Sequence, residues 1–339
     1  MATSLLHDTI LDRFPGNNIN RHREVILVTG ASGFIGGELV RQLEAAGYCI
    51  VSASRRSVSS ASPSVSLPDA NAPESAFEAL LDGVDHVVHL AAIHHAKRAV
   101  SNDEYYLANC VLTAKLAKAA HKRINGKFVF TSSIRAQCGS VFDGVLRESD
   151  PPQPTEFYGQ TKLAAEAEIA AGMPRRNYTI LRPVLVYGPN ATGNLGKLMR
   201  LAALPILLPL KSLPGKRSLL DRGALCAAIL HSFKEPKTDG ETFIVADRRP
   251  VTLGEMVAAM RRGMGRRELL FAVPAALLDF AATLTGQGER RKRLGRDLVA
   301  SSAKLEATGW QPVEDPVRQI EHLCRSSRPI IPASLNARA

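Results

Sequence analysis

Residues 24–40 read EVILVTGASGFIGGELV, and this stretch decides the fold. An apolar run ends at Thr29, glycines follow at positions 30, 33 and 36, and a helical pattern then begins. A strand that turns tightly into a helix points backbone N–H groups at one spot, where a phosphate can bind. A side chain at any of these glycines would block the turn or the approach of a pyrophosphate. The stretch therefore predicts a dinucleotide-binding β-α corner.

Short apolar runs alternate with helical patterns along the first half of the chain. CIVSAS, DHVVHLAA and KFVFTSS look like strands, and AFEALLDG and YYLANCVLTAKLAKAAHKR look like the helices between them. This order predicts right-handed β-α-β units around a parallel sheet that helices cover on both faces. The predicted fold class is α/β, a Rossmann-type doubly wound parallel sheet with a smaller C-terminal lobe for substrate.

Composition narrows the class of ligand. The chain has 339 residues and a formal charge of +11, which suits an anionic partner. Aromatic residues are only 5% and no nucleic-acid motif accompanies the charge, so we expect a phosphorylated small molecule and no nucleic acid. The five cysteines are scattered and show no C-x-x-C spacing. This pattern favours a reducing compartment without a disulfide framework or metal site.

The apolar stretches do not resemble membrane segments. Acidic residues and a proline interrupt the start of the chain, MATSLLHDTILDRFPGNN, where a signal peptide needs a continuous apolar region. LAALPILLPL at 201–210 is too short to span a bilayer, and Pro274 and Asp279 break LLFAVPAALLDFAATLTG at 269–286. We therefore expect a cytoplasmic protein without stable membrane insertion.

The glycine spacing resembles the T-G-x-x-G-[FY]-[IL]-G motif of the extended short-chain dehydrogenase/reductase family. That family pairs the motif with Y-x-x-x-K and a preceding serine. FYGQTKLAAE supplies Tyr158 and Lys162, which lie on one face of a helix, and FVFTSSIRAQ supplies Ser132 and Ser133. Ser133 is the better match to the family's serine. The resemblance covers about Glu24 to Cys324 and implies that Ser133, Tyr158 and Lys162 are catalytic.

The chemistry explains these residue types. A tyrosine pKa of about 10 must fall by roughly three units to exchange protons near neutrality, a cost of about 4 kcal/mol. An ammonium group about 4 Å away, at an effective dielectric constant near 20, supplies roughly that energy. We therefore expect Lys162, helped by an oxidised nicotinamide, to lower the pKa of Tyr158. Ser133 would hydrogen-bond the reacting oxygen.

The resemblance also implies which residues bind ligands. The expected cofactor contacts lie in the glycine corner, after the second and fourth predicted strands, and near the catalytic residues: Gly30, Ser32, Gly33, Phe34, Ile35, Gly36, Arg55, Arg56, Leu90, Ala91, Ala92, Asn109, Tyr158, Lys162 and Pro183. The expected substrate contacts are Ser133, Tyr158, Asn194 and Arg217, of which the last two lie near the nucleotide diphosphate. His94 and His95 either touch the sugar or are exposed loop histidines.

The end of the second predicted strand bears on the choice of cofactor. Family members that prefer NAD place Asp or Glu there for the ribose 2'-hydroxyl, whereas VSASRRS offers Ser54, Arg55 and Arg56. Two arginines suit a 2'-phosphate, so NADP(H) is favoured over NAD(H). Asp69 is a further candidate to approach the adenine.

Three functions remain open. SSIRAQCG, DPPQPTEFYGQTKLAAE and KRSLL resemble the branch with UDP-hexose 4-epimerases and UDP-4-keto-6-deoxy-N-acetylhexosamine 4-reductases, also called UDP-N-acetylquinovosamine dehydrogenases. A reductase exchanges its cofactor every turnover, whereas an epimerase recycles hydride within one bound NAD. The arginine pair therefore favours net reduction of a UDP-sugar, for polysaccharide precursor synthesis. The alternatives are a UDP-glucose or UDP-N-acetylglucosamine 4-epimerase and a dinucleotide sensor without turnover, and the complete catalytic set argues against the sensor.

The resemblance and the pattern of prolines together suggest how the chain divides. We expect a flexible lead-in at 1–22, an NAD(P)-binding Rossmann domain at 23–183, a mainly substrate-binding lobe at 184–324 with strands that return to the sheet, and a tail at 325–339. Within these parts we expect a short strand inside 57–73, a strand at TFIVAD, and a late helix closed by Gly309 with Trp310 packed on the body. A homodimer is expected from resemblance alone.

Overall fold

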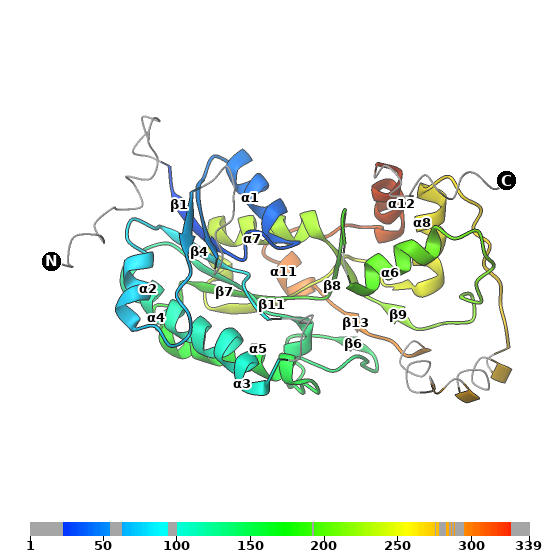
Figure 1. The fold of residues 1–339 in the computed structure, drawn as a ribbon, viewed down its shortest axis with the longest axis horizontal. Helices are drawn as coiled ribbons and strands as arrows, with labels where there is room; N and C mark the ends of the chain where they lie inside the picture. The colour runs from blue at the N-terminus through cyan, green and yellow to red at the C-terminus, as the bar shows by residue number, and fades with distance from the viewer. Residues whose placement is uncertain are drawn as a thin grey trace.

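A computed structural model describes residues 23–54, 63–93, 100–191, 193–274, 276–277, 283–284, 286, 288 and 295–326. A seven-stranded sheet forms the centre of the larger part of the molecule (Figure 1), and each strand pairs with its neighbours in parallel. Across the sheet the order is β11 (Glu241–Val245), β7 (Tyr178–Pro183), β5 (Phe128–Thr131), β4 (His86–His89), β1 (Val25–Thr29), β2 (Cys49–Ser54) and β3 (Ser64–Ser66). The predicted doubly wound α/β fold is confirmed.

Helices cover both faces of this sheet (Figure 1). One face carries α1 (Gly36–Ala45) and α7 (Arg222–Lys234), and the other carries α2 (Glu74–Leu80), α4 (Leu112–Arg123) and α5 (Phe157–Gly172). Strand β1 shows why its sequence is apolar throughout. Ile26 and Val28 pack into the core under α1 and α7, while Val25 and Leu27 pack into the core under the other three helices. A strand buried on both faces needs an unbroken apolar run.

The strand order places a topological switch at β1. The chain passes from β1 to β2 and β3 on one side, and then crosses to β4 on the other side. The carboxyl ends of β1 and β4 therefore lie side by side, with Thr29 paired to His89. In open α/β sheets, ligands bind outside the strand ends at such a switch.

A smaller lobe lies beyond this edge of the sheet (Figure 1). Its helices α6 (Gly193–Ala202), α8 (Leu253–Gly263) and α12 (Pro316–Ser326) enclose an apolar core of their own. Short strand pairs connect the lobe to the body: β8 (Leu185–Tyr187) with β10 (Leu219–Asp221), β9 (Lys216–Arg217) with β12 (Val251–Thr252), and β6 (Val145–Leu146) with β13 (Val299–Ala300). The other described helices are α3 (Asn102–Tyr106), η2 (Leu107–Val111), η3 (Ile134–Ala136), η4 (Pro236–Thr238) and α11 (Ala303–Glu306).

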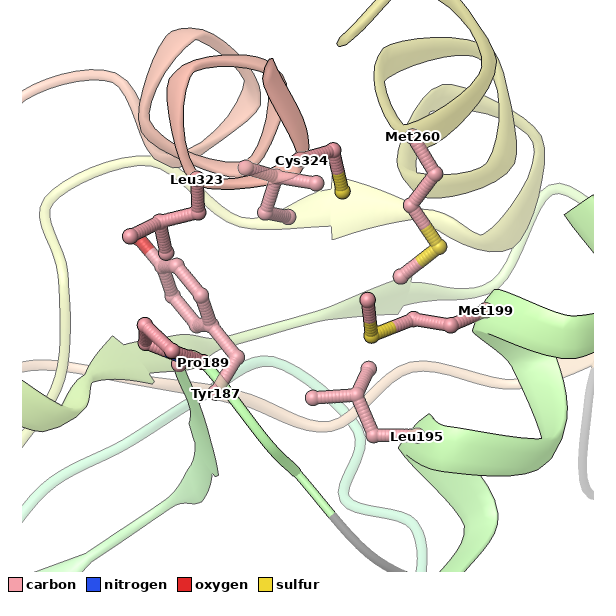
Figure 2. Close-up of a pocket in the computed structure, with 9 residues that line it drawn as sticks. Tyr187, Pro189, Leu195, Met199, Met260, Leu323 and Cys324 are labelled. Atoms are coloured by element: carbon pink, nitrogen blue, oxygen red, sulfur yellow. The ribbon is translucent and has the colours of Figure 1, made fainter. Parts of the chain in front are cut away.

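An apolar cavity lies inside this lobe. In Figure 2, Met199 of α6, Met260 of α8 and Cys324 of α12 converge on it, and Tyr187 closes one side. Its volume of about 20 Å³ leaves room for about one water molecule. None of the predicted catalytic residues lines it, so it is a packing feature of the lobe and does not hold the expected ligands.

Three smaller expectations from the sequence are confirmed. The serine-rich stretch contains β3, and TFIVAD contributes to β11. The late helix is α11, and Gly309 follows it with a φ of +105°, a conformation that favours glycine. Trp310 is buried in the same core as α1 and α7.

No helix in the part of the chain that the structure describes is long and apolar enough to cross a bilayer. Within the same ranges, no three His, Cys, Asp or Glu side chains gather as they would around a metal ion.

Candidate active site

The glycine corner joins β1 to α1, and the backbone itself demands glycine at two positions. Gly30 has a φ of +72°, and a Cβ there would lie 3.0 Å from the backbone nitrogen of Ala91. At Gly36 a Cβ would lie 2.2 Å from the carbonyl oxygen of Gly30, which no packing could accommodate. The N–H of Gly33 donates to that same oxygen at 2.9 Å and closes the turn.

The corner has the donors that a pyrophosphate needs. The backbone N–H groups of Ser32, Phe34 and Ile35 bond to no acceptor among the described residues, and they stand at the start of α1. Ser32 and Gly33 are exposed, so an anion can reach these groups. Unused N–H groups together with the positive end of a helix dipole form an anion site. These residues therefore fit the dinucleotide that the sequence predicts.

Arg222, which the sequence reasoning missed, supports this corner. Its guanidinium group donates to the carbonyl oxygens of Phe34 and Pro189, each at 3.2 Å, and lies 4.8 Å from the centre of the Phe34 ring. The same group lies 3.8 Å from a carboxylate oxygen of Glu38 in α1. It adds a positive charge beside the N–H groups. Because Arg222 follows Phe34 by 188 positions, no local motif could have pointed to it.

The loop after β4 runs beside the glycine corner. Leu90, Ala91 and Ala92 are partly exposed there, as a cofactor-facing segment should be. Asn109 of η2 behaves differently from our expectation of a direct contact, because it is 1% exposed. Its amide oxygen accepts from the N–H of Ile93 at 2.7 Å and its amide nitrogen donates to the carbonyl of Ile93 at 3.0 Å. Asn109 therefore positions the loop from behind.

A buried histidine connects the two strand ends. His89 is fully buried, and its ring nitrogens lie 2.7 Å from the hydroxyl of Thr29 and 2.9 Å from that of Thr113. Thr113 donates its proton to the carbonyl of Asn109, so it accepts from Nε2 of His89, and Nδ1 accepts from Thr29. Burial, and next the charge of Lys162, lower the pKa of His89 to about 3. The ring is therefore neutral and structural.

The predicted catalytic side chains meet at the end of β5. Ser133 caps η3 and is partly exposed, and its side chain is hydrogen-bonded to Tyr158 of α5. Ser132 is 3% exposed and points instead into the protein, where it donates to Glu166. Of the two serines, only Ser133 is thus available to a ligand beside the phenol.

The pKa of Tyr158 is where the structure departs from our expectation. Burial of the phenol raises its pKa to about 12, and the hydrogen bond with Ser133 and the charge of Arg135 oppose this only in part. Lys162, whose amine donates to the carbonyl oxygen of Thr131 at 2.9 Å, is not among the groups that lower this pKa. Desolvation of the phenolate outweighs both the hydrogen bond with Ser133 and the charge of Arg135, so the phenol is protonated at neutral pH.

Lys162 is itself a perturbed group. Its amine is 4.4 Å from the centre of the Phe130 ring, and the residue is 2% exposed. Burial lowers the pKa of Lys162 to about 7, against the opposing charge of Glu166. Strongly shifted pKa values in one place are typical of active sites.

Behind Lys162 lies a buried ion pair that the sequence reasoning also missed. Glu166 follows Lys162 by four residues on α5 and accepts bonds from Arg182 of β7, both residues being buried. Arg182 also donates to Gln137, whose own amide holds the carbonyl of Asp150 at 2.6 Å. The same four-residue spacing that predicts the Tyr158–Lys162 pair would have identified Glu166.

The pH dependence of stability tests the environment of Lys162. Because its pKa is about 7 in the folded protein and about 10.5 when unfolded, unfolding takes up a proton between these values, and stability contributed by this group rises with pH there. We expect Lys162→Met to gain most over the wild type below pH 7. That advantage should shrink by about 3 kcal/mol by about pH 9, as measured by urea unfolding. The exposed Lys118→Met is the control, and an equal advantage at both pH values would contradict the lowered pKa.

The other predicted ligand contacts lie on other parts of the chain or outside the described residues. Asn194 is exposed at the start of α6, and Pro183 is buried at the end of β7. Arg217 donates to the carbonyl oxygen of Ser140 at 2.5 Å, so it lies against the loop that follows Ser133. Asp69 accepts from the N–H groups of Asn71 and Ala72 and caps a turn. Arg55, Arg56, His94 and His95 lie outside the described residues.

Comparison with known proteins places the chain in a family. The model of the NAD dependent epimerase/dehydratase family matches residues 26–272. A UDP-glucose 4-epimerase of Vibrio cholerae is 32% identical over 85% of this chain and 90% of its own length. A ceramide reductase of Caulobacter vibrioides is 26% identical over 84% of this chain and 88% of its own length. The solved UDP-N-acetylglucosamine 4-epimerase of Bacillus cereus superposes with a TM-score of 0.70 at 22% identity, covering 89% of this chain and all of that one.

The fold, the glycine corner and the Ser133–Tyr158–Lys162 group together define an enzyme of the extended short-chain dehydrogenase/reductase type, dependent on a nicotinamide dinucleotide. More narrowly, the chain belongs to the NAD dependent epimerase/dehydratase family.

Proposed function

We propose that the protein reduces the C4 ketone of a UDP-linked 4-keto-6-deoxy-N-acetylhexosamine, with NADP(H) as the redox cofactor. The observation that carries this direction is the end of β2, where Ser54 offers no carboxylate to a ribose 2'-hydroxyl and the sequence continues with Arg55 and Arg56, which suits a cofactor exchanged at every turnover. The phenol of Tyr158 is hydrogen-bonded to Ser133 and has a pKa raised to about 12, so at neutral pH it holds a proton that it can give. Ketone reduction needs such an acid in both candidate reactions.

Each residue then has a defined task. When bound, the reduced nicotinamide supplies a hydride to C4. Ser133 and Tyr158 hold the ketone oxygen, and Tyr158 donates its proton to that oxygen as negative charge develops there. Lys162 carries its positive charge below a pH of about 7, close enough to Tyr158 on the helix to help recover a proton from solvent. The backbone N–H groups of Ser32, Phe34 and Ile35 take the pyrophosphate.

The preference for NADP(H) rests on the end of β2. The strand finishes at Ser54, which has no carboxylate to accept from a ribose 2'-hydroxyl, and Arg55 and Arg56 follow in the sequence. Asp69 caps a turn of its own segment, where its Oδ1 accepts from the N–H groups of Asn71 and Ala72.

A UDP-hexose 4-epimerase is the second candidate, because the relative that is 32% identical carries that name. In this reaction Tyr158 would first accept a proton from the C4 hydroxyl and later return it to the other face of the ketone. The phenol would have to lose its proton first, and a pKa of about 12 makes that step harder. The proposal that the substrate carries UDP is supported by the same kind of likeness, because similar proteins include UDP-sugar 4-epimerases.

Separate incubations distinguish the candidates. The purified protein is mixed with the UDP-4-ketosugar and NADPH or NADH, and in parallel with UDP-glucose or UDP-N-acetylglucosamine without added cofactor, and the products are identified by mass spectrometry and sugar analysis. We expect consumption of NADPH and a reduced sugar in the first mixture. Interconversion of the 4-epimers without added cofactor would support the epimerase. Cofactor binding without any product would support a sensor.

A further inference from the structure

Two neighbouring loops of the smaller lobe expose large apolar side chains. On the first loop Leu204, Ile206 and Leu207 are 43%, 45% and 65% exposed, and on the second Phe271 is 41% exposed. We call residues 204–208 and 269–273 the apolar loop pair. Single exposed leucines are ordinary on protein surfaces, but a group on adjacent segments marks an interaction site.

The two loops are joined by backbone hydrogen bonds. The N–H of Leu208 donates to the carbonyl of Leu269 at 3.0 Å, and the N–H of Phe271 donates to the carbonyl of Leu208 at 3.1 Å. Just beyond, the N–H of Lys211 donates to the carbonyl of Phe271 at 3.3 Å. The loops lie at the right edge of Figure 1, outside α6 and α8 and away from the central sheet.

A buried arginine fixes the shape of this surface. Arg261 of α8 is 1% exposed, and its guanidinium group donates to carbonyl oxygens of both loops, at 3.0 Å for Leu204, 2.9 Å for Ile206 and 3.1 Å for Leu269. Because one buried cation holds both backbones, the exposed side chains stand on a rigid base. Their exposure is therefore a built feature of the lobe.

Positive charge predominates around the apolar loop pair, and Glu268, which directly precedes the second loop, is paired with Arg262 at 2.6 Å. Residues 189–220 contain five lysines and arginines and no Asp or Glu. Lys197, Arg200 and Lys211 are exposed in this segment, and Arg267 is exposed in the chain that leads to Phe271. With the other described residues, none of these four cations forms an ion pair.

We propose that the apolar loop pair docks on the surface of a lipid bilayer that contains anionic phospholipid. Protruding Leu, Ile and Phe side chains can enter the headgroup and upper acyl region, while unpaired cations around them contact lipid phosphates. The combination points to an anionic bilayer. Apolar side chains alone would suit any hydrophobic partner, and cations alone would suit any anion. The apolar loop pair would lie in the headgroup region of the bilayer and would not cross the membrane. This inference does not depend on which sugar reaction the enzyme performs.

Flotation of the full-length protein with vesicles tests the proposal. The vesicles are phosphatidylcholine alone or phosphatidylcholine mixed with phosphatidylglycerol. We expect binding to the mixed vesicles to be at least about tenfold stronger, and to weaken as salt screens the cations. Equal binding to both compositions, or to neither, would overturn the proposal.

Matched variants locate the surface. Ile206→Ser with Leu207→Ser should reduce binding to mixed vesicles by at least about tenfold, while Val145→Ser, an equally exposed change on β6 (46%), should not. Lys211→Glu should weaken binding several-fold, and Arg318→Glu on α12 should not. Unchanged melting curves show that the variants fold. If the serine pair binds vesicles like the wild type, or if it only splits a dimer in solution, the surface belongs to another partner.

Discussion

Replacing Tyr158 with phenylalanine is expected to lower kcat by about 10²- to 10⁴-fold, the range that a lost general acid costs. The phenylalanine ring fills nearly the same space, so the fold and the dinucleotide affinity should remain within about twofold. What is lost is the proton held at a pKa of about 12 and the hydrogen bond with Ser133. Steady-state kinetics of sugar turnover, with a fluorescence titration of the dinucleotide, measure the two effects separately.

The neighbouring Tyr105→Phe is the matched control. Tyr105 packs edge-on against Phe157, with ring centres 6.4 Å apart, and its phenol makes only the smallest contribution to the raised pKa of Tyr158. This variant should keep most of the activity. If Tyr158→Phe also kept more than about a tenth of the activity, another group would have to supply the proton.

Gly36→Ala is expected to have the largest effect on the cofactor site. The new methyl group would begin 2.2 Å from the carbonyl oxygen of Gly30, and backbone atoms of Ala31 also lie within 3 Å of it, so the corner must move. Overpacking of this kind costs roughly 1–3 kcal/mol of stability. Because the displaced backbone carries the N–H groups for the pyrophosphate, dinucleotide affinity should fall by at least about tenfold.

Gly37→Ala is the control, one position further along α1. A Cβ there meets nothing closer than the carbonyl oxygen of Ala31 at 3.9 Å. Because alanine favours a helix over glycine by about 1 kcal/mol, this variant should be slightly more stable and should bind the dinucleotide normally. Thermal unfolding and dinucleotide titration of both variants check the opposite signs. A Gly36→Ala protein that melts and binds like Gly37→Ala would show that the corner is not as tight as described.

Local patterns predicted the fold and the face of the site. The run from Glu24 to Val40 gives the strand, turn and helix because each depends on neighbours in sequence, and the spacing of Tyr158 and Lys162 places both on one helix face. In the structure Ser133 bonds the phenol and Ser132 bonds Glu166, and the catalytic role of Ser133 stays a prediction.

What depends on contacts between distant segments could not be predicted in this way. The pKa values of Tyr158 and Lys162 are set mainly by burial, which a sequence spacing does not report, and the lowering of the Tyr158 pKa by Lys162 with an oxidised nicotinamide stays a prediction. The exposure of Asn109 depends on how η2 packs on the loop after β4. Arg222 and Arg261 act on backbone carbonyls far along the chain, and carbonyl groups leave no trace in a sequence pattern.

One measurement tests the central claim, that hydride is transferred at the sugar C4 with Tyr158 as the acid. The enzyme is incubated with the UDP-4-ketosugar and NADPH that carries deuterium at both positions of the nicotinamide C4, and the product is analysed by mass spectrometry and NMR. We predict that deuterium appears on C4 of the sugar with the wild type, and that Tyr158→Phe binds NADPH but forms almost no labelled product. An unlabelled reduced sugar, or deuterium at another carbon of the sugar, would contradict the account.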